Sequence, residues 1–387
     1  MHFQELSYFS DMMNEILALR KELHANPELS GNEINTARRI KDFISLHSNA
    51  EIIDNIGGNG LAAVFEFSKN GPQIMIRCEL DALPIQEKND FKHRSCIDGI
   101  SHKCGHDGHM SIVAGLIFWL RAQTFDKGQV VLLFQPAEET GKGAHQMLTD
   151  KKFDRFSPDF VFALHNLPGK PLNSVILKKE FFSATVKSMF VKFTGKEAHA
   201  SEPENGNNPA LAISKLIAEF SKLNTPEPSS PEFSILTPVH FKMGDRSYGI
   251  SPASAELHYT IRAWSNPVME ELMHKIKTLI AEIADAHKLK QETDWFEYFP
   301  EVKNDAGCNE IIEKAANKNG LKLLKEDIPF RFGEDFGWYS KNYPAAMFGL
   351  GAGENSPALH HADYDFPDEI LESGINMFQT MIEDIFT

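Results

Sequence analysis

Residues 130–139 read VVLLFQPAEE, an apolar run that leads directly into the carboxylate pair Glu138-Glu139. Two further short apolar stretches, Ile74 to Cys78 and Phe160 to Leu164, have the composition of strands that are buried on both faces of a parallel sheet. Helical patterns lie between these stretches. The sequence therefore predicts an α/β fold whose central sheet is mostly parallel and is flanked by helices.

Polar side chains follow each of these apolar runs. In open α/β sheets, ligands bind just beyond the carboxyl ends of the strands, so we expect the residues that follow the runs to converge on one crevice. A fourth run, at 345–350, continues the pattern through a glycine-rich stretch. The polar residues that follow the four runs are Glu79, Asp81, Glu138, Glu139, His165, His360 and His361.

The segment 104–109, CGHDGH, places a thiol, two imidazoles and a carboxylate within six residues. A lone histidine or a Glu-Glu pair is more often a solvated loop residue, and a lone cysteine is often a small buried side chain. Here, however, such donors follow several predicted strands and also stand at the start of a predicted helix, and this combination indicates a metal site. The donors of this set are Cys104, His106, Glu139, His165 and His360.

Imidazole, carboxylate and thiolate donors suit zinc or a neighbouring first-row metal better than calcium or magnesium. Zn, Mn, Co and Ni are all compatible with this donor set. Five donors exceed the need of one tetrahedral ion, so the sequence favours two divalent ions per subunit that share a ligand.

Glu138 and Glu139 are adjacent, and adjacent side chains in extended backbone point to opposite sides. One of them can bind metal while the other faces the substrate. A carboxylate beside water that a metal has activated can take its proton, and the resulting hydroxide attacks a carbonyl. The sequence therefore predicts hydrolysis of an amide or ester, with His199 as a candidate donor to the negative oxygen of the tetrahedral intermediate.

Length and pattern together predict two domains. The chain has 387 residues, which is long for one core. From about 183 to 297 the βα alternation gives way to strands and two helices typical of a compact α+β unit. We therefore expect a catalytic domain at 1–182 and 298–387, with a smaller domain inserted at 183–297.

Near the N-terminus, apolar spacing predicts a helix at about 11–24. Ser30 and Glu33 have capping-box spacing, which predicts a second helix from about Gly31 to His47.

Composition narrows the possible partners. The chain carries 39 basic and 54 acidic residues and a formal net charge of −15, which argues against nucleic acid and anionic membranes. The N-terminus lacks a basic leader with a long apolar segment, and the run around 112–120 is too short for a membrane span. The four cysteines lack the spacing of a disulfide framework. We expect a cytoplasmic enzyme that acts on a small molecule.

Several motifs, spread over nearly the whole chain, resemble the M20 metallopeptidases, and most closely their N-acyl-amino-acid amidohydrolase branch, which includes hippurate hydrolases and indole-acetyl-amino-acid hydrolases. The motifs are RKELHANPELS at 20–30, LDALPI at 80–85, CGHDGH at 104–109, QPAEE at 135–139, LHN at 164–166, EDF at 334–336 and LH at 359–360.

The resemblance implies roles for individual residues. Cys104 would bridge two metal ions, and His106, Glu139, His165 and His360 would complete the dinuclear site. Glu138 would be the general base and would return its proton to the leaving amine, while Asp81 would support the site indirectly. His199 would donate to the oxyanion, in many relatives from the lid domain of a partner subunit. Relatives are commonly homodimers or homotetramers joined through that lid.

One departure from the family concerns substrate recognition. Relatives usually carry Asn-Val-Ile-Pro before a lid strand that ends in an arginine, and that Asn commonly helps to hold the substrate carboxylate. Here Gly249 takes its place, and the strand ends in Arg262. The resemblance implies an N-acyl-amino acid or a short peptide as substrate. A dipeptidase or carboxypeptidase with the same site, and a catalytically silent binding protein, are the alternatives.

Overall fold

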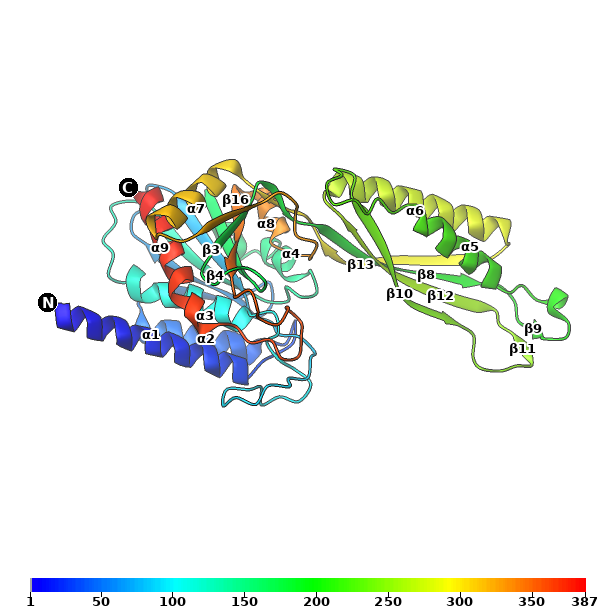
Figure 1. Ribbon diagram of the computed structural model, residues 1–387, viewed down its shortest axis with the longest axis horizontal. Coiled ribbons are helices and arrows are strands. Elements are labelled where there is room, and N and C mark those ends of the chain that lie inside the picture. Colours follow the sequence, from blue (N-terminus) through cyan, green and yellow to red (C-terminus); the bar gives the residue numbers. More distant parts are fainter. Residues whose placement is uncertain (1) are drawn as a thin grey trace. The chain divides into compact units, whose positions relative to one another are not determined.

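The computed structural model describes residues 2–387, with side chains from residue 10 onward (Figure 1). The chain divides into two compact units. Unit 1 comprises the chain up to Phe182 together with Val302–Asp327 and Asp335–Thr387, and unit 2 comprises Ser183–Glu301 and Ile328–Glu334. The chain thus leaves unit 1 twice.

Unit 1 is built on an eight-stranded sheet. The strands, in their order across the sheet, are β1 (Glu51–Ile56), β2 (Gly60–Glu66), β4 (Gln129–Gln135), β3 (Gln73–Glu79), β5 (Phe160–Leu167), β16 (Ala345–Gly351), β6 (Val175–Lys178) and β15 (Leu323–Glu326). The pairs β4/β3, β3/β5, β5/β16 and β6/β15 are parallel, and the others are antiparallel. The predicted α/β class with a mostly parallel sheet is confirmed.

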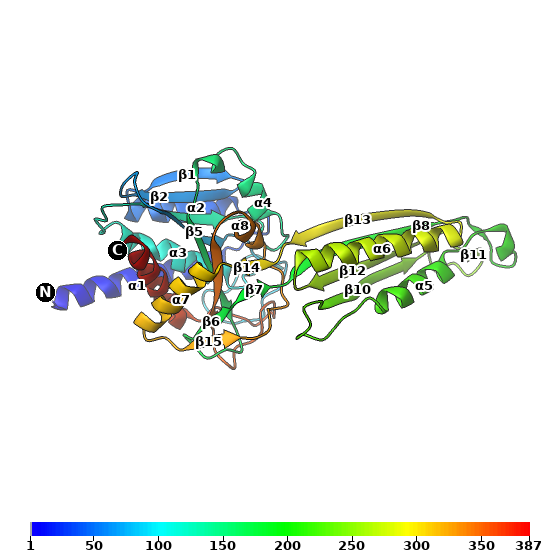
Figure 2. The ribbon, with the colours of Figure 1, turned by 90° about the horizontal axis from the view of Figure 1, so that it is seen from above.

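The central strands are apolar because helices cover both of their faces. Alternate residues such as Ile74, Ile76, Leu132 and Phe162 pack into the main core with the helices of one face. Those helices are α1 (His2–Ala25), α2 (Ile34–His47), α3 (His106–Leu120), α7 (Ala306–Lys318) and α9 (Leu371–Phe386), and they lie over the sheet in Figures 1 and 2. The shorter helices α4 (Gly143–Leu148) and α8 (Gly337–Asn342) contact β4 and β16.

The predicted capping box at residues 30–33 is wrong. Helix α2 begins at Ile34, and no side chain caps it at Glu33. The Ser30 hydroxyl instead donates to Asp81 at 2.6 Å, and Glu33 is completely buried. Glu28 provides the cap, because its carboxylate accepts hydrogen bonds from both the backbone N–H and the hydroxyl of Thr36, at 2.7 and 2.9 Å.

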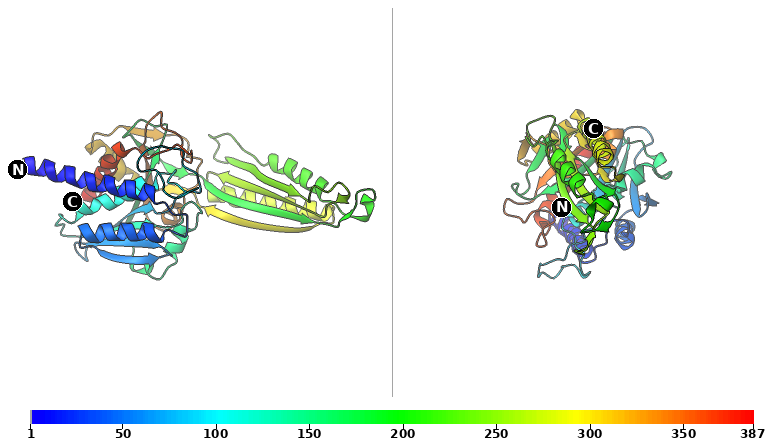
Figure 3. Two further views of the ribbon diagram at one scale, coloured as in Figure 1. Left: turned by 90° about the horizontal axis from the view of Figure 1, so that it is seen from below. Right: turned by 90° about the vertical axis from the view of Figure 1, so that its right-hand side faces the viewer.

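Unit 2 is an α+β layer pair. Its antiparallel sheet has the strand order β10 (Ser234–Met243), β12 (Ser254–Ala263), β8 (Thr185–Thr194) and β13 (Lys290–Phe299). Helices α5 (Ala210–Ser221) and α6 (Asn266–Ala286) pack on one face and share a separate core with the strands, as the two views of Figure 3 illustrate. A small two-stranded antiparallel sheet of β9 (Ala198–His199) and β11 (Ile250–Ser251) lies at one end of this sheet.

The remaining strands, β7 (Glu180–Ser183) and β14 (Val302–Asn304), pair with each other. Across residues 2–387, no helix combines the length and apolar character that crossing a membrane requires.

Candidate metal centre

The start of helix α3 positions the first two candidate ligands. Cys104 and His106 flank Gly105, which has a φ of +93°, a conformation that glycine adopts readily. A Cβ atom at Gly105 would lie 2.6 Å from Oδ1 of Asn166. Only glycine therefore allows the chain to turn into α3 this close to β5, and the turn puts both side chains at the carboxyl edge of the sheet.

Backbone carbonyls fix the tautomers of two histidines. Nδ1 of His106 donates to the carbonyl oxygen of Asp81 at 2.8 Å, and Nδ1 of His165 donates to the carbonyl oxygen of Asn166 at 2.9 Å. A carbonyl can only accept, so in each neutral ring the proton is on Nδ1 and the lone pair that could bind a metal is on Nε2. Nε2 of His106 is buried and has no hydrogen-bond partner among the described residues.

The candidate ligand atoms form two overlapping groups. Those of Cys104, His106 and His165 lie within 4.8 Å of one another, and so do those of Cys104, Glu139 and His360. Cys104 belongs to both groups. The structure thus brings together all five residues that the sequence singled out as ligands, and it places the cysteine where the two groups meet.

The spacings suit ions with nitrogen, oxygen and sulfur ligands. Sγ of Cys104 lies 3.6 Å from Nε2 of His165, and bonds of about 2.3 and 2.1 Å to one tetrahedral zinc ion would put sulfur and nitrogen roughly 3.6 Å apart. Oε1 of Glu139 lies 3.7 Å from Nε2 of His360. The His360 side chain is 51% exposed and that of Glu139 is 13% exposed, so the second group faces solvent.

Glu138 lies beside the ligand groups. Its Oε2 is 3.8 Å from Nε2 of His106, while Oε1 of Glu139 is 3.9 Å from the same nitrogen. The carboxylate of Asp81 accepts a hydrogen bond from the backbone N–H of Glu139 at 3.0 Å. Asp81 therefore contacts the carboxylate pair and His106 through separate atoms, an arrangement that can orient ligands without binding metal itself.

Negative charge dominates this cluster. Burial lowers the pKa of His106, but the Asp81 carboxylate and the charge of Glu79 outweigh it and raise the pKa to about 10. Burial lowers the pKa of His165 to about 3, assisted by the neighbouring His109. Burial, followed by the two nearby glutamates, raises the pKa of the Cys104 thiol. The cluster therefore favours positive charge, and a cation would stabilise the Cys104 thiolate.

Two residues of the site have unusual backbone conformations. Ala137 precedes the carboxylate pair at a φ of +52°, and His360 has a φ of +65°. Such values cost roughly 1–2 kcal/mol in residues with a Cβ and persist when surrounding contacts hold them. The N–H of Ala137 donates to Glu33 at 2.8 Å, and that of His360 donates to the carbonyl oxygen of Lys103 at 2.8 Å.

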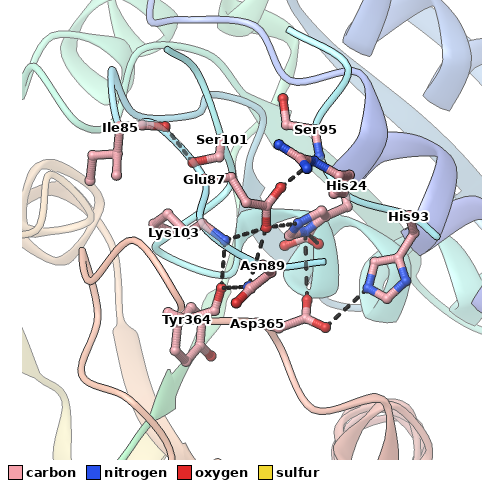
Figure 4. Close-up of polar contacts among 12 residues, drawn as sticks. His24, Ile85, Glu87, Asn89, His93, Ser95, Ser101, Lys103, Tyr364 and Asp365 are labelled. Atoms are coloured by element: carbon pink, nitrogen blue, oxygen red, sulfur yellow. Dashed lines mark hydrogen bonds and ion pairs between the residues drawn. The ribbon is translucent and has the colours of Figure 1, made fainter. Parts of the chain in front are cut away.

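A buried ionic network holds the chain on the N-terminal side of Cys104. The ammonium group of Lys103 contacts the carboxylate of Glu87 and donates to the carbonyl oxygen of Tyr364 at 2.7 Å (Figure 4). His24 bridges Glu87 and Asp107, at 3.1 and 2.8 Å. Lys103 thus ties the segment that begins the Cys104 turn to the segment that carries His360.

A second buried network supports the first ligand group. Glu79 accepts a hydrogen bond from Nδ1 of His109 at 2.7 Å and pairs with Arg77. Arg77 also binds Asp335 at 2.6 Å. Sequence reasoning names Glu79, and His109 as part of the CGHDGH motif, but does not connect the two, and it assigns no role to Arg77. The signal is a charged residue inside an otherwise apolar strand.

Three candidate substrate residues belong to unit 2. His199 is exposed on β9, opposite Ile250 in the two-stranded sheet, and the carbonyl of Gly249 accepts the N–H of Ala200 at 2.9 Å. His199 and Gly249 are therefore neighbours. Arg262 is half-buried on β12 and donates to the carbonyl oxygen of Arg331 at 2.6 Å.

The backbone also fixes the tautomer of neutral His199. The N–H of Ser201 donates to Nδ1 of His199 at 3.1 Å, and the Ser201 hydroxyl lies 2.6 Å from the same atom. Because a backbone N–H only donates, Nδ1 is the acceptor and the ring proton is on Nε2. Nε2 is then available as a hydrogen-bond donor.

A sheet whose strand ends carry thiol, imidazole and carboxylate donors, with a further carboxylate beside them, defines a metallohydrolase type of centre. Residues 75–384 match the family model described as "Peptidase family M20/M25/M40". The chain is 32% identical over 363 residues to an N-acetyl-L-cysteine deacetylase of Bacillus subtilis, covering 94% of this chain and 86% of that protein.

Two further proteins support the same family assignment. A hippurate hydrolase of Campylobacter jejuni is 29% identical over 374 residues, covering 95% of this chain and 96% of that protein. The crystal structure of the Bacillus subtilis YXEP protein, described as a dinuclear metal binding peptidase from the M20 family, superimposes with a TM-score of 0.83 at 25% identity, covering 97% and 99% of the two chains. The chain belongs to peptidase family M20/M25/M40 and is a hydrolase that acts on amide bonds.

Proposed function

We propose that this protein is a metal-dependent amidohydrolase that cleaves N-acyl-amino acids into a carboxylic acid and a free amino acid. The observation that carries the proposal is the pair of ligand groups sharing Cys104, with the Glu138 carboxylate 3.8 Å from Nε2 of His106. Donors for two cations and a carboxylate that can accept and donate a proton then lie in one place.

In this proposal, two divalent ions would be held by Cys104, which belongs to both ligand groups, together with His106, His165, Glu139 and His360. Zn, Mn, Co and Ni remain the candidate ions. When bound, such ions supply activation of a water molecule and polarisation of the scissile carbonyl. Nδ1 contacts of His106 and His165 with backbone carbonyls keep their Nε2 atoms oriented for ligation.

Glu138 is the proposed general base. Its side chain is 6% exposed, so a substrate that enters the site would exclude most of the remaining water around it. The carboxylate accepts a proton from the attacking water and afterwards donates it to the nitrogen of the leaving amine. Asp81 positions the turn by holding the Glu139 N–H.

The substrate class rests on the relatives. The two enzymes compared above are named for N-acetyl-L-cysteine and hippurate, both of which are N-acylated amino acids with a free carboxylate. Nothing lies within 4 Å of a Cβ built at Gly249, so there is space beside this residue, whose carbonyl binds the N–H of Ala200 next to His199. We propose that Arg262 or the segment at Gly249 contacts the substrate carboxylate.

We also propose that unit 2 is a lid and oligomerisation domain and that His199 acts in the active site of a partner subunit. Arg262 pairs with Val186, whereas Ser254, three residues after Ser251 of β11, pairs with Thr194. Eight residues (262 − 254) of extended strand span about 27 Å, while an acyl-amino acid spans roughly 10 Å. A substrate held by Arg262 would therefore be out of reach of His199 of the same chain, and His199 would then come from a partner in a homodimer or homotetramer.

The test is release of free amino acid from N-acetyl, N-benzoyl and N-indoleacetyl amino acids and from dipeptides, after chelation and reloading with each candidate metal. We expect metal-dependent turnover of the acylated amino acids and loss of at least 100-fold in kcat for Glu138→Gln. Turnover of dipeptides alone would assign a dipeptidase instead. Wild-type activity in Glu138→Gln would refute the assignment of the base.

Mixed oligomers test the partner role. His199→Ala and Glu138→Gln subunits, each inactive alone, are expected to regain activity when mixed, because one site in the hybrid then combines an intact Glu138 with an intact His199. If mass measurement demonstrates that hybrid oligomers have formed and they recover no activity, the proposal that His199 acts in a partner's site is refuted.

A further inference from the structure

Glu33 connects the N-terminal segment to the carboxylate pair. It lies just before α2, yet its side chain does not cap that helix, and the residue is completely buried. Oε1 accepts the N–H of Gly31 at 2.7 Å and that of Ala137 at 2.8 Å, and Oε2 accepts the side-chain amide of Asn59 at 3.0 Å. A carboxylate that receives these bonds binds backbone N–H groups more strongly than a neutral acceptor would.

The bond to Ala137 falls at the residue where β4 becomes the turn of Glu138 and Glu139. Ala137 has a φ of +52°, and its carbonyl oxygen accepts the N–H groups of Lys142 and Gly143 at 3.3 and 3.1 Å. The left-handed conformation at Ala137 sets the directions of both following side chains. A change there would displace the proposed base and a proposed ligand together.

The N–H groups on both sides of Glu138 are thus held by buried carboxylates. Glu33 holds the N–H of Ala137, and Asp81 holds that of Glu139. The loop of residues 30–33 serves both, because Ser30 donates to Asp81 at 2.6 Å. A segment more than one hundred residues earlier in the chain therefore fixes this turn at two points.

We propose that Glu33 is a positioning residue that aims Glu138 and Glu139 at the ligand groups by holding the Ala137 peptide in its left-handed conformation. The kinetic part of this inference rests on the proposed function, whereas its metal-binding part does not. Supporting groups of this kind typically change metal affinity by about 10 to 100-fold when they are removed.

Glu28 offers a matched control. It is a glutamate of the same segment whose carboxylate accepts three hydrogen bonds, from Asn35 at 2.6 Å and from the N–H and hydroxyl of Thr36 at 2.7 and 2.9 Å. These bonds hold α2, and none reaches the turn at Ala137. A role of Glu33 limited to anchoring the N-terminal segment would make the two variants behave alike.

The experiment is titration of metal-free, full-length protein with Co²⁺, monitored by the d–d absorption in the visible and by the thiolate-to-cobalt charge-transfer band in the near ultraviolet. We expect Glu33→Ala to weaken Co²⁺ binding at least 10-fold and Glu28→Ala to weaken it less than 3-fold. Glu33→Gln keeps an oxygen that can accept from Ala137 and is expected to recover most of the affinity. The proposal is overturned if Glu33→Ala binds within 3-fold of wild type, or if Glu28→Ala is equally impaired.

Kinetics give a second readout. On whichever acyl-amino acid the wild type hydrolyses, we expect Glu33→Ala to lower kcat at least 10-fold with KM within 3-fold. Unchanged kcat would overturn the positioning role. If Glu33→Ala does not fold by circular dichroism, Glu33→Asp, whose shorter side chain cannot reach both N–H groups, replaces it under the same criteria.

Failure of the proposed function is distinguishable from failure of this inference. A wild type that hydrolyses no member of the substrate panel would refute the proposed function. The Co²⁺ titration would still decide whether Glu33 positions the ligands.

Discussion

Replacing Arg77 with methionine should destabilise unit 1 severely. Arg77 lies on β3 with its side chain completely buried, and it pairs with the equally buried carboxylates of Glu79 and Asp335. Its Nε also donates to Gln135 at 2.9 Å. Methionine fills a similar volume but leaves two buried carboxylates without their shared cation.

Removing one partner of a buried ionic cluster costs about 3–5 kcal/mol. The lower end of that range applies here, because both carboxylates retain a hydrogen-bond donor in the variant. Glu79 still accepts from His109, and Asp335 still accepts from the N–H of Ala144 at 2.9 Å. Against a typical net stability of about 5–15 kcal/mol, the loss is large. We expect a fall of about 3 kcal/mol in the free energy of unfolding of unit 1.

Arg155→Met is the matched control. Arg155 makes a two-pronged pair with Glu51 at 3.0 Å for both bonds, but the two side chains are 46% and 57% exposed. Exposed pairs contribute below about 1 kcal/mol. Both variants replace an arginine with a methionine, so the difference between their losses of unfolding free energy reports on the burial of the ion pair.

The assay is urea denaturation combined with hydrogen exchange of peptides from β3 and β4, which reports on unit 1 alone. Burial raises the pKa of Glu79, but Arg77 and His109 lower it to well below its usual value. The stability that this carboxylate contributes is present above its unfolded pKa of about 4.3 and is lost as pH falls. The difference in unfolding free energy between Arg77→Met and the wild type should therefore decrease at acidic pH. A cost for Arg77→Met no greater than that for Arg155→Met would refute the reasoning.

Further predictions concern the pH dependence of stability at His24, the backbone at Gly105 and the open position at Gly249. Burial lowers the pKa of His24, but the charge of Asp107 and the hydrogen bonds with Asp107 and Glu87 raise it to about 9. The stability that protonated His24 contributes is complete below about pH 6.5 and is lost as pH rises to about 9, so the free energy of unfolding should fall by up to about 3 kcal/mol over that window. Urea titrations should show no such fall in His24→Gln. Gly105→Ala places a Cβ against Asn166 at a positive φ and should abolish tight Co²⁺ binding, with wild-type affinity as the contradicting result. A Cβ at Gly249 meets no atom within 4 Å, so Gly249→Asn should keep its Tm within about 2 °C of wild type and change KM for carboxylate substrates. A larger loss of Tm would show that the position does not accept a side chain.

The order of strands and donor groups along the chain is readable from the sequence. The runs that form β3, β4, β5 and β16 are recognisable because strands buried on both faces are continuously apolar. The donors that follow them converge because parallel strands place their carboxyl ends at one edge. This reasoning brings Cys104, His165 and Glu139 to one location, although their roles as ligands remain predictions.

Local patterns fail where distant segments compete for the same group. Ser30 and Glu33 have the spacing of a capping box, but their side chains bind Asp81 and Ala137 instead. A buried peptide N–H that needs a partner outweighs a helix end that Glu28 can cap. Spacing within one segment carries no information about that competition.

The fold class and the set of donors follow from the sequence alone, because strand burial and donor chemistry are properties of short segments. Which nitrogen of His106 and of His165 faces the ligand groups is a property of the folded chain, because backbone carbonyls from Asp81 and Asn166 set the tautomers. The same holds for the left-handed conformation of Ala137, which contacts from Glu33 maintain. These features depend on atoms brought together from distant parts of the chain, and no local pattern encodes them.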